Sequence, residues 1–511
     1  MAAIDPNQER KVIPRWHSLA ASAKQGEIGA THDGGQVVLP FSEEEREESL
    51  SEHREHWSQT GTLAFAEDFV AAALVLGEPE AAREAAEVVL ANPGSSPLAK
   101  TVAQRILTPD AAVTDLDDFD PFDVFASRQQ VARLKGRLRE DPRAALTWAE
   151  ISRAYAALGQ SEKAVAAMDV ALSLAPNDRF LLRSAARLGL HIGEPDRAHR
   201  LLTSSDGLRS DPWLLSAEIA IAPLANRQSR NHRHARQVLE SGRFFPHSTS
   251  ELASALGTEA LTAGDRRGLR KLLGESLVAP TENAVAQAEW VSRQEQSFEF
   301  DSNLLGVEDS YEARAHYLAR ERQDEESLTN AWAWLRDQPF ASEPAVFGSY
   351  RGALVRDYET AIRFARAGLR ANPTDYMLRN NLIFALASSG RVEEAREELD
   401  LLDEHSSTQK IEGDWGLTVD ATRGLMAFRE GSPEVGRKAY LQVIGEATDP
   451  SLKALAAILW AREEAHADTA EAEHAAGLAR RLVAAVQGMQ GPRVDDVPAW
   501  LEHLKPAEVA S

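Results

Sequence analysis

The sequence contains no cysteine in its 511 residues. This absence excludes disulfide bonds, thiolate nucleophiles and zinc sites built from cysteine. Long apolar runs are missing too: the longest obvious one, Phe69 to Leu76, is far shorter than the roughly 20 residues that span a membrane. The polar start, MAAIDPNQERK, has no apolar core of a signal peptide. We therefore expect no membrane segment, and the lack of cysteine suits a cytoplasmic location.

Recognisable catalytic motifs are also absent. The sequence has no GxxxxGK[ST] phosphate loop, no GxGxxG after a strand, no HExxH and no GxSxG. We therefore expect no enzymatic activity, no cofactor and no bound metal. An enzyme whose site forms only in the folded chain is a less favoured alternative, since motifs miss convergent sites.

Positive charge is in short supply. The formal net charge is −23 and the pI is about 5.1, with only ten lysines among the 56 basic residues. Most of such a surface repels a polyanion, so wholesale nucleic-acid binding is disfavoured, although local basic patches remain possible. The excess of arginine, with abundant alanine, suggests a GC-rich bacterial source.

What the sequence does contain is helix-forming composition and a repeated spacing. Hydrophobic residues make up 43% of the chain and are led by Ala and Leu, which favours helices over sheet. The clearest spacing lies in residues 148–176. It combines large residues on one helical stripe, a glycine turn, small residues on a second helix and a closing proline: Trp148, Ile151, Tyr155, Gly159, Ala164, Ala171 and Pro176.

This pattern closely resembles the tetratricopeptide (TPR) repeat, which implies two antiparallel helices per unit. Copies follow at intervals of 34 residues, at Leu182, Gly193, Ala198 and Leu202, and later at Pro212, Pro246, Pro280, Pro339 and Pro373. The resemblance implies membership of the TPR superfamily. We predict an all-α solenoid of about nine to eleven helical hairpins in two blocks.

The domain organisation follows from these repeats and from changes in composition. We predict an extended N-terminal arm (1–41), degenerate helical hairpins (42–109), an acidic linker (110–123), a first TPR-like array (124–296), a register break (297–309), a second array with a C-terminal cap (310–487) and a tail (488–511).

The predicted arm carries two clusters, RKVIPRWH at residues 10–17 and GGQVVLPF at residues 34–41. In one interpretation the arm is extended and packs its Val, Ile and Trp side chains on the first helices. In the other it docks on another protein. The sequence leaves open whether the arm occupies the groove of the array, where it would be autoinhibitory.

The TPR resemblance implies that a ligand peptide lies in a concave groove lined by the first helix of each hairpin. Transferred onto this chain, that helix gives the groove candidates Arg153, Arg183, Arg187, His191, Tyr350, Asn380, Asn381 and Phe384. Arginines there suit a carboxylate or an acidic peptide, and adjacent asparagines suit an extended backbone. We therefore predict a non-enzymatic scaffold or adaptor that binds another protein or peptide, with partner identity and oligomeric state left open.

A second candidate surface is a basic ridge formed by Arg233, Arg236, Arg267 and Arg270. The register of 34 residues makes Arg233 equivalent to Arg267 and Arg236 to Arg270, so stacked repeats place them side by side. The alternative function is a regulatory protein that contacts nucleic acid or another polyanion through this ridge. The competing interpretation is that these arginines pair with neighbouring Asp and Glu.

Overall fold

The computed structural model describes residues 10–19, 22, 43–95, 97–108, 123–295, 297–406, 413–487, 489 and 496–504. Within these ranges the chain forms α-helices and short 3-10 helices, and no β-strand. The predicted all-α fold is therefore confirmed. The GGQVVLPF cluster, nearly all of the acidic linker and much of the tail lie outside the described residues.

The chain divides into two compact units. The N-terminal unit comprises Arg10–Ala313 together with Arg336–Phe340, and the C-terminal unit comprises Arg314–Leu335 and the chain from Ala341 onward.

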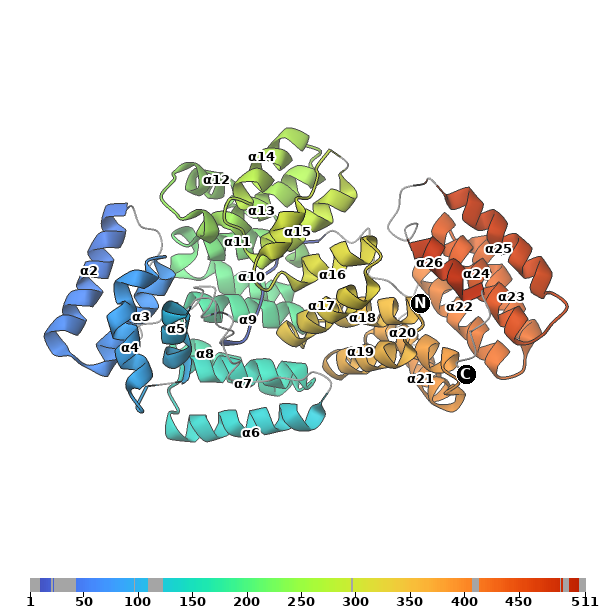
Figure 1. Ribbon diagram of the computed structural model, residues 1–511, viewed down its shortest axis with the longest axis horizontal. Helices are drawn as coiled ribbons and strands as arrows, with labels where there is room; N and C mark the ends of the chain where they lie inside the picture. The colour runs from blue at the N-terminus through green and yellow to red at the C-terminus, as the bar shows by residue number, and fades with distance from the viewer. Residues whose placement is uncertain are drawn as a thin grey trace. The chain divides into compact units, whose positions relative to one another are not determined.

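The helices of the N-terminal unit include two short hairpins and then the first array (Figure 1). They are α2 (Glu43–Thr60), α3 (Leu63–Val75), α4 (Arg83–Ala91), α5 (Pro97–Leu107), α6 (Val124–Glu140), α7 (Ala145–Ala157), α8 (Ser161–Leu174), α9 (Arg179–His191), α10 (Pro195–Thr203), α11 (Pro212–Ile221), α12 (His232–Glu240), α13 (Pro246–Thr262), α14 (Arg266–Ser276) and α15 (Glu282–Gln294).

The C-terminal unit holds the second array. Its helices are α16 (Tyr311–Arg320), which begins in the N-terminal unit, α17 (Asp324–Asp337), which ends there, α18 (Glu343–Leu354), α19 (Tyr358–Ala371), α20 (Tyr376–Ser388), α21 (Val392–Ser406), α22 (Gly413–Arg429), α23 (Pro433–Glu446), α24 (Pro450–His466), α25 (Ala472–Val486) and α26 (Val497–Leu501).

Successive helices pair into eleven hairpins within the described residues. The pairs are α2–α3, α4–α5, α7–α8, α9–α10, α11–α12, α13–α14, α16–α17, α18–α19, α20–α21, α22–α23 and α24–α25, with α6, α15 and α26 left single. This agrees with the predicted nine to eleven TPR-like hairpins.

The opening repeat folds as its spacing predicts. Helices α7 and α8 pack together across a turn in which Gly159 has φ +69°, a left-handed conformation that suits glycine. Ala164 and Ala171 are fully buried, which allows the two helices to approach closely.

Left-handed turn residues recur at the repeat length. Gly193 lies 34 residues after Gly159, and in the second array Arg322, Arg356 and Gly390 are again 34 apart, all with positive φ. The two arginines take a conformation that side chains with a Cβ rarely adopt. For this reason a search for turn glycines does not find those two hairpins.

Close contacts between helices replace large side chains at some positions. Gly368 is one of them: a Cβ on this residue would lie 2.5 Å from the Cβ of Ala345 and 2.7 Å from Cδ1 of Leu378. The second array therefore depends on a missing side chain where α19 packs against α18 and α20.

Candidate functional site

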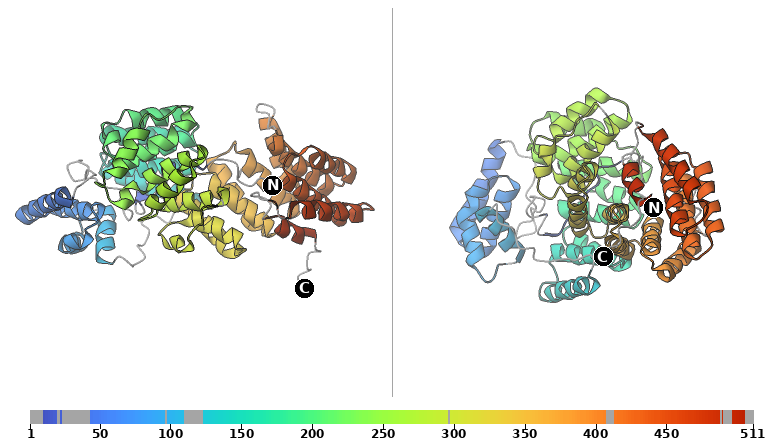
Figure 2. Two further views of the ribbon diagram at one scale, coloured as in Figure 1. Left: turned by 90° about the horizontal axis from the view of Figure 1, so that it is seen from above. Right: turned by 45° about the vertical axis from the view of Figure 1, so that its right-hand side comes forward.

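The first helices of the hairpins form a continuous face in the N-terminal unit. Helices α7, α9, α11, α13 and α15 contact one another in series, and both Figure 1 and Figure 2 show α13, α14 and α15 packed side by side. We call the surface carried by these first helices the N-terminal face. An extended stretch of chain, residues 10–19, lies against it, and we call this stretch the arm segment.

The arm segment is buried along its length. Val12, Pro14 and Trp16 are buried, whereas Lys11 and Ile13 between them are only half-buried, as in an extended chain. Val12 joins the apolar cluster formed by residues of α9, α11, α13 and α14. The arm therefore packs its apolar side chains on the first array, not on the helices that directly follow it in the sequence.

Side chains of the face bind the main chain of the arm segment. Nε of Arg153 donates to the carbonyl oxygen of Trp16 at 3.2 Å, and Nδ2 of Asn283 donates to that of Ile13 at 2.9 Å. Nε2 of Gln287 donates to the carbonyl oxygen of Arg10 at 3.2 Å. Because these contacts use backbone oxygens, they hold an extended chain whatever its side chains.

The arginines of the arm segment meet a single carboxylate. Arg10 donates to both oxygens of Glu312, with Nε at 2.8 Å and Nη2 at 3.0 Å, and Nη2 of Arg15 pairs with the same group. Nη1 and Nη2 of Arg10 also donate to Gln287 at 2.7 Å and to Asn283 at 2.8 Å. This two-pronged, charge-assisted arrangement is specific for a guanidinium group.

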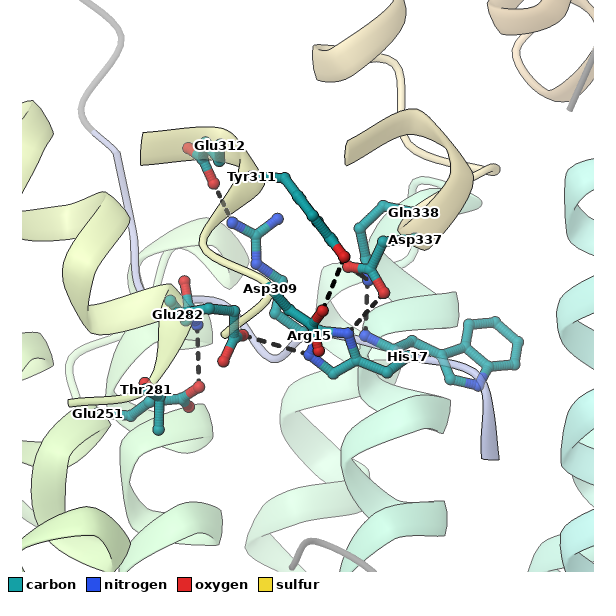
Figure 3. Close-up of polar contacts among 12 residues, drawn as sticks. Arg15, His17, Glu251, Thr281, Glu282, Asp309, Tyr311, Glu312, Asp337 and Gln338 are labelled. Atoms are coloured by element: carbon teal, nitrogen blue, oxygen red, sulfur yellow. Dashed lines mark hydrogen bonds and ion pairs between the residues drawn. The ribbon is translucent and has the colours of Figure 1, made fainter. Parts of the chain in front are cut away.

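His17 lies between two carboxylates (Figure 3). Its Nδ1 is 2.8 Å from Oδ1 of Asp337, and its Nε2 is 3.2 Å from Oε1 of Glu282. Burial acts to lower the pKa of His17, but the charges and hydrogen bonds of Asp337 and Glu282 outweigh it and raise the pKa well above its usual value. Burial likewise acts to raise the pKa of both carboxylates, and His17 brings both below their usual values. The charged imidazolium donates from both nitrogens.

The four groove candidates of the first array all lie on the N-terminal face. Besides bonding the arm, Arg153 donates to the carbonyl oxygen of Asp337 at 2.6 Å, and Arg183 pairs with Glu251 at 2.8 Å. Arg187 lies over the ring of Phe340 at 5.1 Å. Burial, and then the charge of Arg187, lower the pKa of His191 to about 4. Of the four, Arg153 bonds the arm segment directly, and their use in partner binding stays a prediction.

The sequence analysis missed the acidic and amide side chains that hold the arm. Asn283 and Gln287 had a usable signal, because they stand four residues apart as polar residues on an otherwise apolar helix face. Glu282, Glu312 and Asp337 had none, since they come from separate helices and meet only in the folded unit.

A matching arrangement occurs within the C-terminal unit. Its first helices α18, α20, α22 and α24 contact in series and form the C-terminal face. Residues 496–504, the tail segment, include α26 and the 3-10 helix Glu502–Leu504, and both pack on α24. Trp500 is 2% exposed, and its Nε1 donates to the hydroxyl oxygen of Tyr350 at 3.2 Å.

The predicted groove residues of this array surround the tail segment or lie beneath it. The hydroxyl of Tyr350 donates to Asp496 at 3.0 Å, and Phe384 meets the ring of Trp500 edge-on at 6.1 Å between ring centroids. Asn381 donates to Oγ of Ser349 at 3.1 Å. Asn380 is fully buried, and neither polar atom of its amide has a hydrogen-bond partner among the described residues.

His503 anchors the end of the tail segment as a neutral ring. Its Nε2 is 2.9 Å from the carbonyl oxygen of Leu354, and Nη1 of Arg462 is 3.3 Å from its Nδ1. Burial, and then the charge of Arg462, lower the pKa of His503 to about 3. Nε2 therefore donates and Nδ1 accepts, since the carbonyl can only accept.

The basic ridge lies on second helices of the first array, α12 and α14. Arg233, Arg236, Arg267 and Arg270 are exposed, and none forms an ion pair with a residue that the structure describes. By contrast the nearby Arg266 pairs with Glu295 at 3.0 Å. Within the described ranges, then, the ridge arginines are not neutralised by neighbouring acids.

Two kinds of feature are absent from the described residues. No helix in them is long and apolar enough to cross a membrane. No group of three or more His, Asp or Glu side chains in them is placed to hold a metal ion.

These features define an α-solenoid of TPR-like helical hairpins with an extended or short helical segment on the first-helix face of each unit. No family model matches the chain, and no curated protein matches it. Among solved structures, the chain is similar to the APC/C hetero-tetramer Cut9–Hcn1, with a TM-score of 0.33 and 12% identity over 90% of this chain and 94% of that chain.

It is similar also to yeast Tom70, with a TM-score of 0.29 and 11% identity over 90% of this chain and 96% of the other. A third similar structure is the human IFIT1 dimer with m7Gppp-AAAA, with a TM-score of 0.33 and 14% identity over 71% of this chain and 95% of that chain. Such low scores carry no functional argument, and the architecture rests on the helices of this chain.

Proposed function

We propose that this protein is a non-enzymatic, cytoplasmic scaffold that binds another protein through its first-helix faces. One observation carries the proposal: the N-terminal face holds an extended chain by bonding three of its carbonyl oxygens, through Arg153, Asn283 and Gln287. A surface built in this way suits a peptide segment of a partner.

The occupied state of both faces gives the proposal its second element. Because residues of the same chain cover both faces, a partner must displace the arm segment or the tail segment to reach the groove candidates. Partner binding is then weaker than the intrinsic affinity by the fraction of chains whose face is open.

The test is affinity capture with the full chain, followed by mass spectrometry. Wild type is compared with an arm variant (Trp16→Ala), a tail variant (Trp500→Ala) and a surface control (Val435→Ser), since Val435 is 64% exposed. We expect recovery of at least one partner to rise about tenfold, or about 1.4 kcal/mol, with the arm or tail variant and to stay constant with the control. The same partner list at the same recovery from all four proteins would refute the function.

A second candidate function rests on the basic ridge. Four exposed arginines without acidic partners among the described residues suit a polyanion, although the net charge of −23 opposes binding elsewhere. Replacing Arg233, Arg236, Arg267 and Arg270 by alanine should abolish retardation of nucleic acid at low salt. Unretarded nucleic acid with the wild-type chain would remove this candidate.

A further inference from the structure

The N-terminal face presents acidic groups to the arm segment. The carboxylates Glu282, Glu312 and Asp337 face the basic side chains Arg10, Arg15 and His17. All six side chains are largely buried. Emptying the site would leave buried carboxylates without compensation, which proteins avoid. The site therefore requires a basic occupant.

The same site requires an aromatic residue between its basic contacts. Trp16 is fully buried, and its ring centroid lies 5.2 Å from that of Phe340. A smaller residue would leave a cavity beside Phe340, because the surrounding side chains relax only in part.

The arginines of the face do not reverse this acidic character. Arg183 pairs with Glu251 at 2.8 Å, and Arg153 has Glu150 at 3.4 Å. Their charges are spent within the face, so an acidic peptide, which arginines in a groove would suit, is not what the site favours.

We propose that this site accepts, in place of the arm segment, a basic-aromatic segment of a partner protein. The segment carries two cationic residues five positions apart, the second followed directly by Trp-His, as Arg10, Arg15, Trp16 and His17 are arranged here. This inference rests on the proposed scaffold function and names the chemistry of the partner. It also makes the arm segment a competitor of that partner.

The experiment uses a fluorescent peptide of residues 10–22 and two full-length chains. One chain is wild type, and the other has a weakened arm (Arg10→Ala, Arg15→Ala and Trp16→Ala). We expect the peptide to bind the weakened-arm chain at least tenfold more tightly than wild type, because the wild-type arm competes. Equal affinity for the two chains, or no binding to either, overturns the proposal.

A charge-reversed pair controls for general attraction between a basic peptide and an acidic protein. A peptide with Arg10→Glu and Arg15→Glu should bind the weakened-arm chain at least tenfold less tightly. Adding Glu312→Arg to that chain should invert the preference, so that the reversed peptide binds better. An unchanged preference would place the binding elsewhere and overturn the proposal.

Wild-type protein gives a second readout should the weakened-arm chain fail to fold. Excess peptide should replace the arm and expose its amides at Trp16 and Leu19, which bond Gln338 and Glu150, to hydrogen exchange. Unchanged protection at saturating peptide overturns the proposal. So does a doubled mass of the wild-type protein without peptide, which would assign the site to a second copy's arm.

The two claims fail separately. If the peptide does not bind but partner capture still depends on Trp16, the basic-aromatic specificity is wrong and the scaffold function stands. If the peptide does not bind and capture is also indifferent to Trp16 and Trp500, both are wrong.

Discussion

Nε of Arg153 donates a 3.2 Å hydrogen bond to the carbonyl oxygen of Trp16, across 137 residues of sequence. One partner belongs to the first helix of the clearest repeat, and the other to an arm without regular secondary structure. The bond ties the start of the described chain to the face where a ligand is expected.

Replacing Trp16 with alanine should release the arm segment. Truncation of a fully buried tryptophan costs about 3–5 kcal/mol, so we expect trypsin to cleave after Lys11 and Arg15 at least tenfold faster than in wild type. Trp500→Ala is the matched control, because it removes an equally buried ring from the C-terminal unit. Equal cleavage of the arm in wild type and Trp16→Ala would show that Trp16 does not hold it.

Alkaline pH should also release the arm segment. The folded-state pKa of His17 is raised, so its stabilisation is complete below the unfolded value of about 6.5 and is lost as the pH rises through the folded value. The groups around it are Glu282 on α15, Asp337, Asp309, Arg15 and Arg153. The measurement is the protection of arm amides against pH, corrected for intrinsic exchange rates. A His17→Gln variant with the same alkaline profile as wild type would contradict the assignment.

The tail segment should respond to pH in the opposite direction. The folded-state pKa of His503 is lowered to about 3, so its contribution to stability is lost as the pH falls below the unfolded value of about 6.5. Exchange of amides in residues 496–504 should therefore increase between pH 6.5 and pH 4, and His503→Gln should flatten that response. A tail that becomes more protected in acid would refute the neutral form.

Turn residues offer a test of stability in two directions. Gly193→Ala should lower the free energy of unfolding by about 1 kcal/mol, because its φ of +75° suits glycine alone. Asp468 has φ +50° after the end of α24, so Asp468→Gly should raise the free energy of unfolding by a similar amount. Urea unfolding measures both, and shifts of the same sign in the two variants would contradict the argument.

The close approach at Gly368 predicts a larger loss. Valine there would place methyl groups against Ala345 and Leu378, whose atoms already lie within 3 Å of the position that a Cβ on this residue would take. Overpacking of this kind costs about 1–3 kcal/mol. Calorimetry of Gly368→Val should show a lower melting temperature, whereas Gly445→Val, where no atom lies within 4 Å of the Cβ, should leave steric packing unchanged.

The sequence predicted the fold well because the TPR-like pattern is local. Gly159, Ala164 and Ala171 each act within one hairpin, so their spacing is visible without knowledge of the rest. The same search missed Arg322 and Arg356, because nothing in an arginine signals a left-handed turn.

The candidate site was predictable only in part. Helix periodicity located Arg153 and Arg183 on first helices, but it did not reveal that nearby acids pair with them. The meeting of His17 with Glu282 and Asp337 depends on contacts between residues 265 and 320 positions apart. Such contacts leave no spacing to read, and the bacterial origin of the chain likewise stays a prediction.

Hydrogen exchange of the wild-type full chain tests the central claim most directly. If the arm segment lies on the N-terminal face, the amides of Trp16 and Leu19 should exchange at least about a hundredfold more slowly than unstructured peptide, equivalent to about 2.7 kcal/mol of docking. Their donation to Gln338 and Glu150 is the physical reason. Exchange of both amides at the rate of a free peptide would contradict the account.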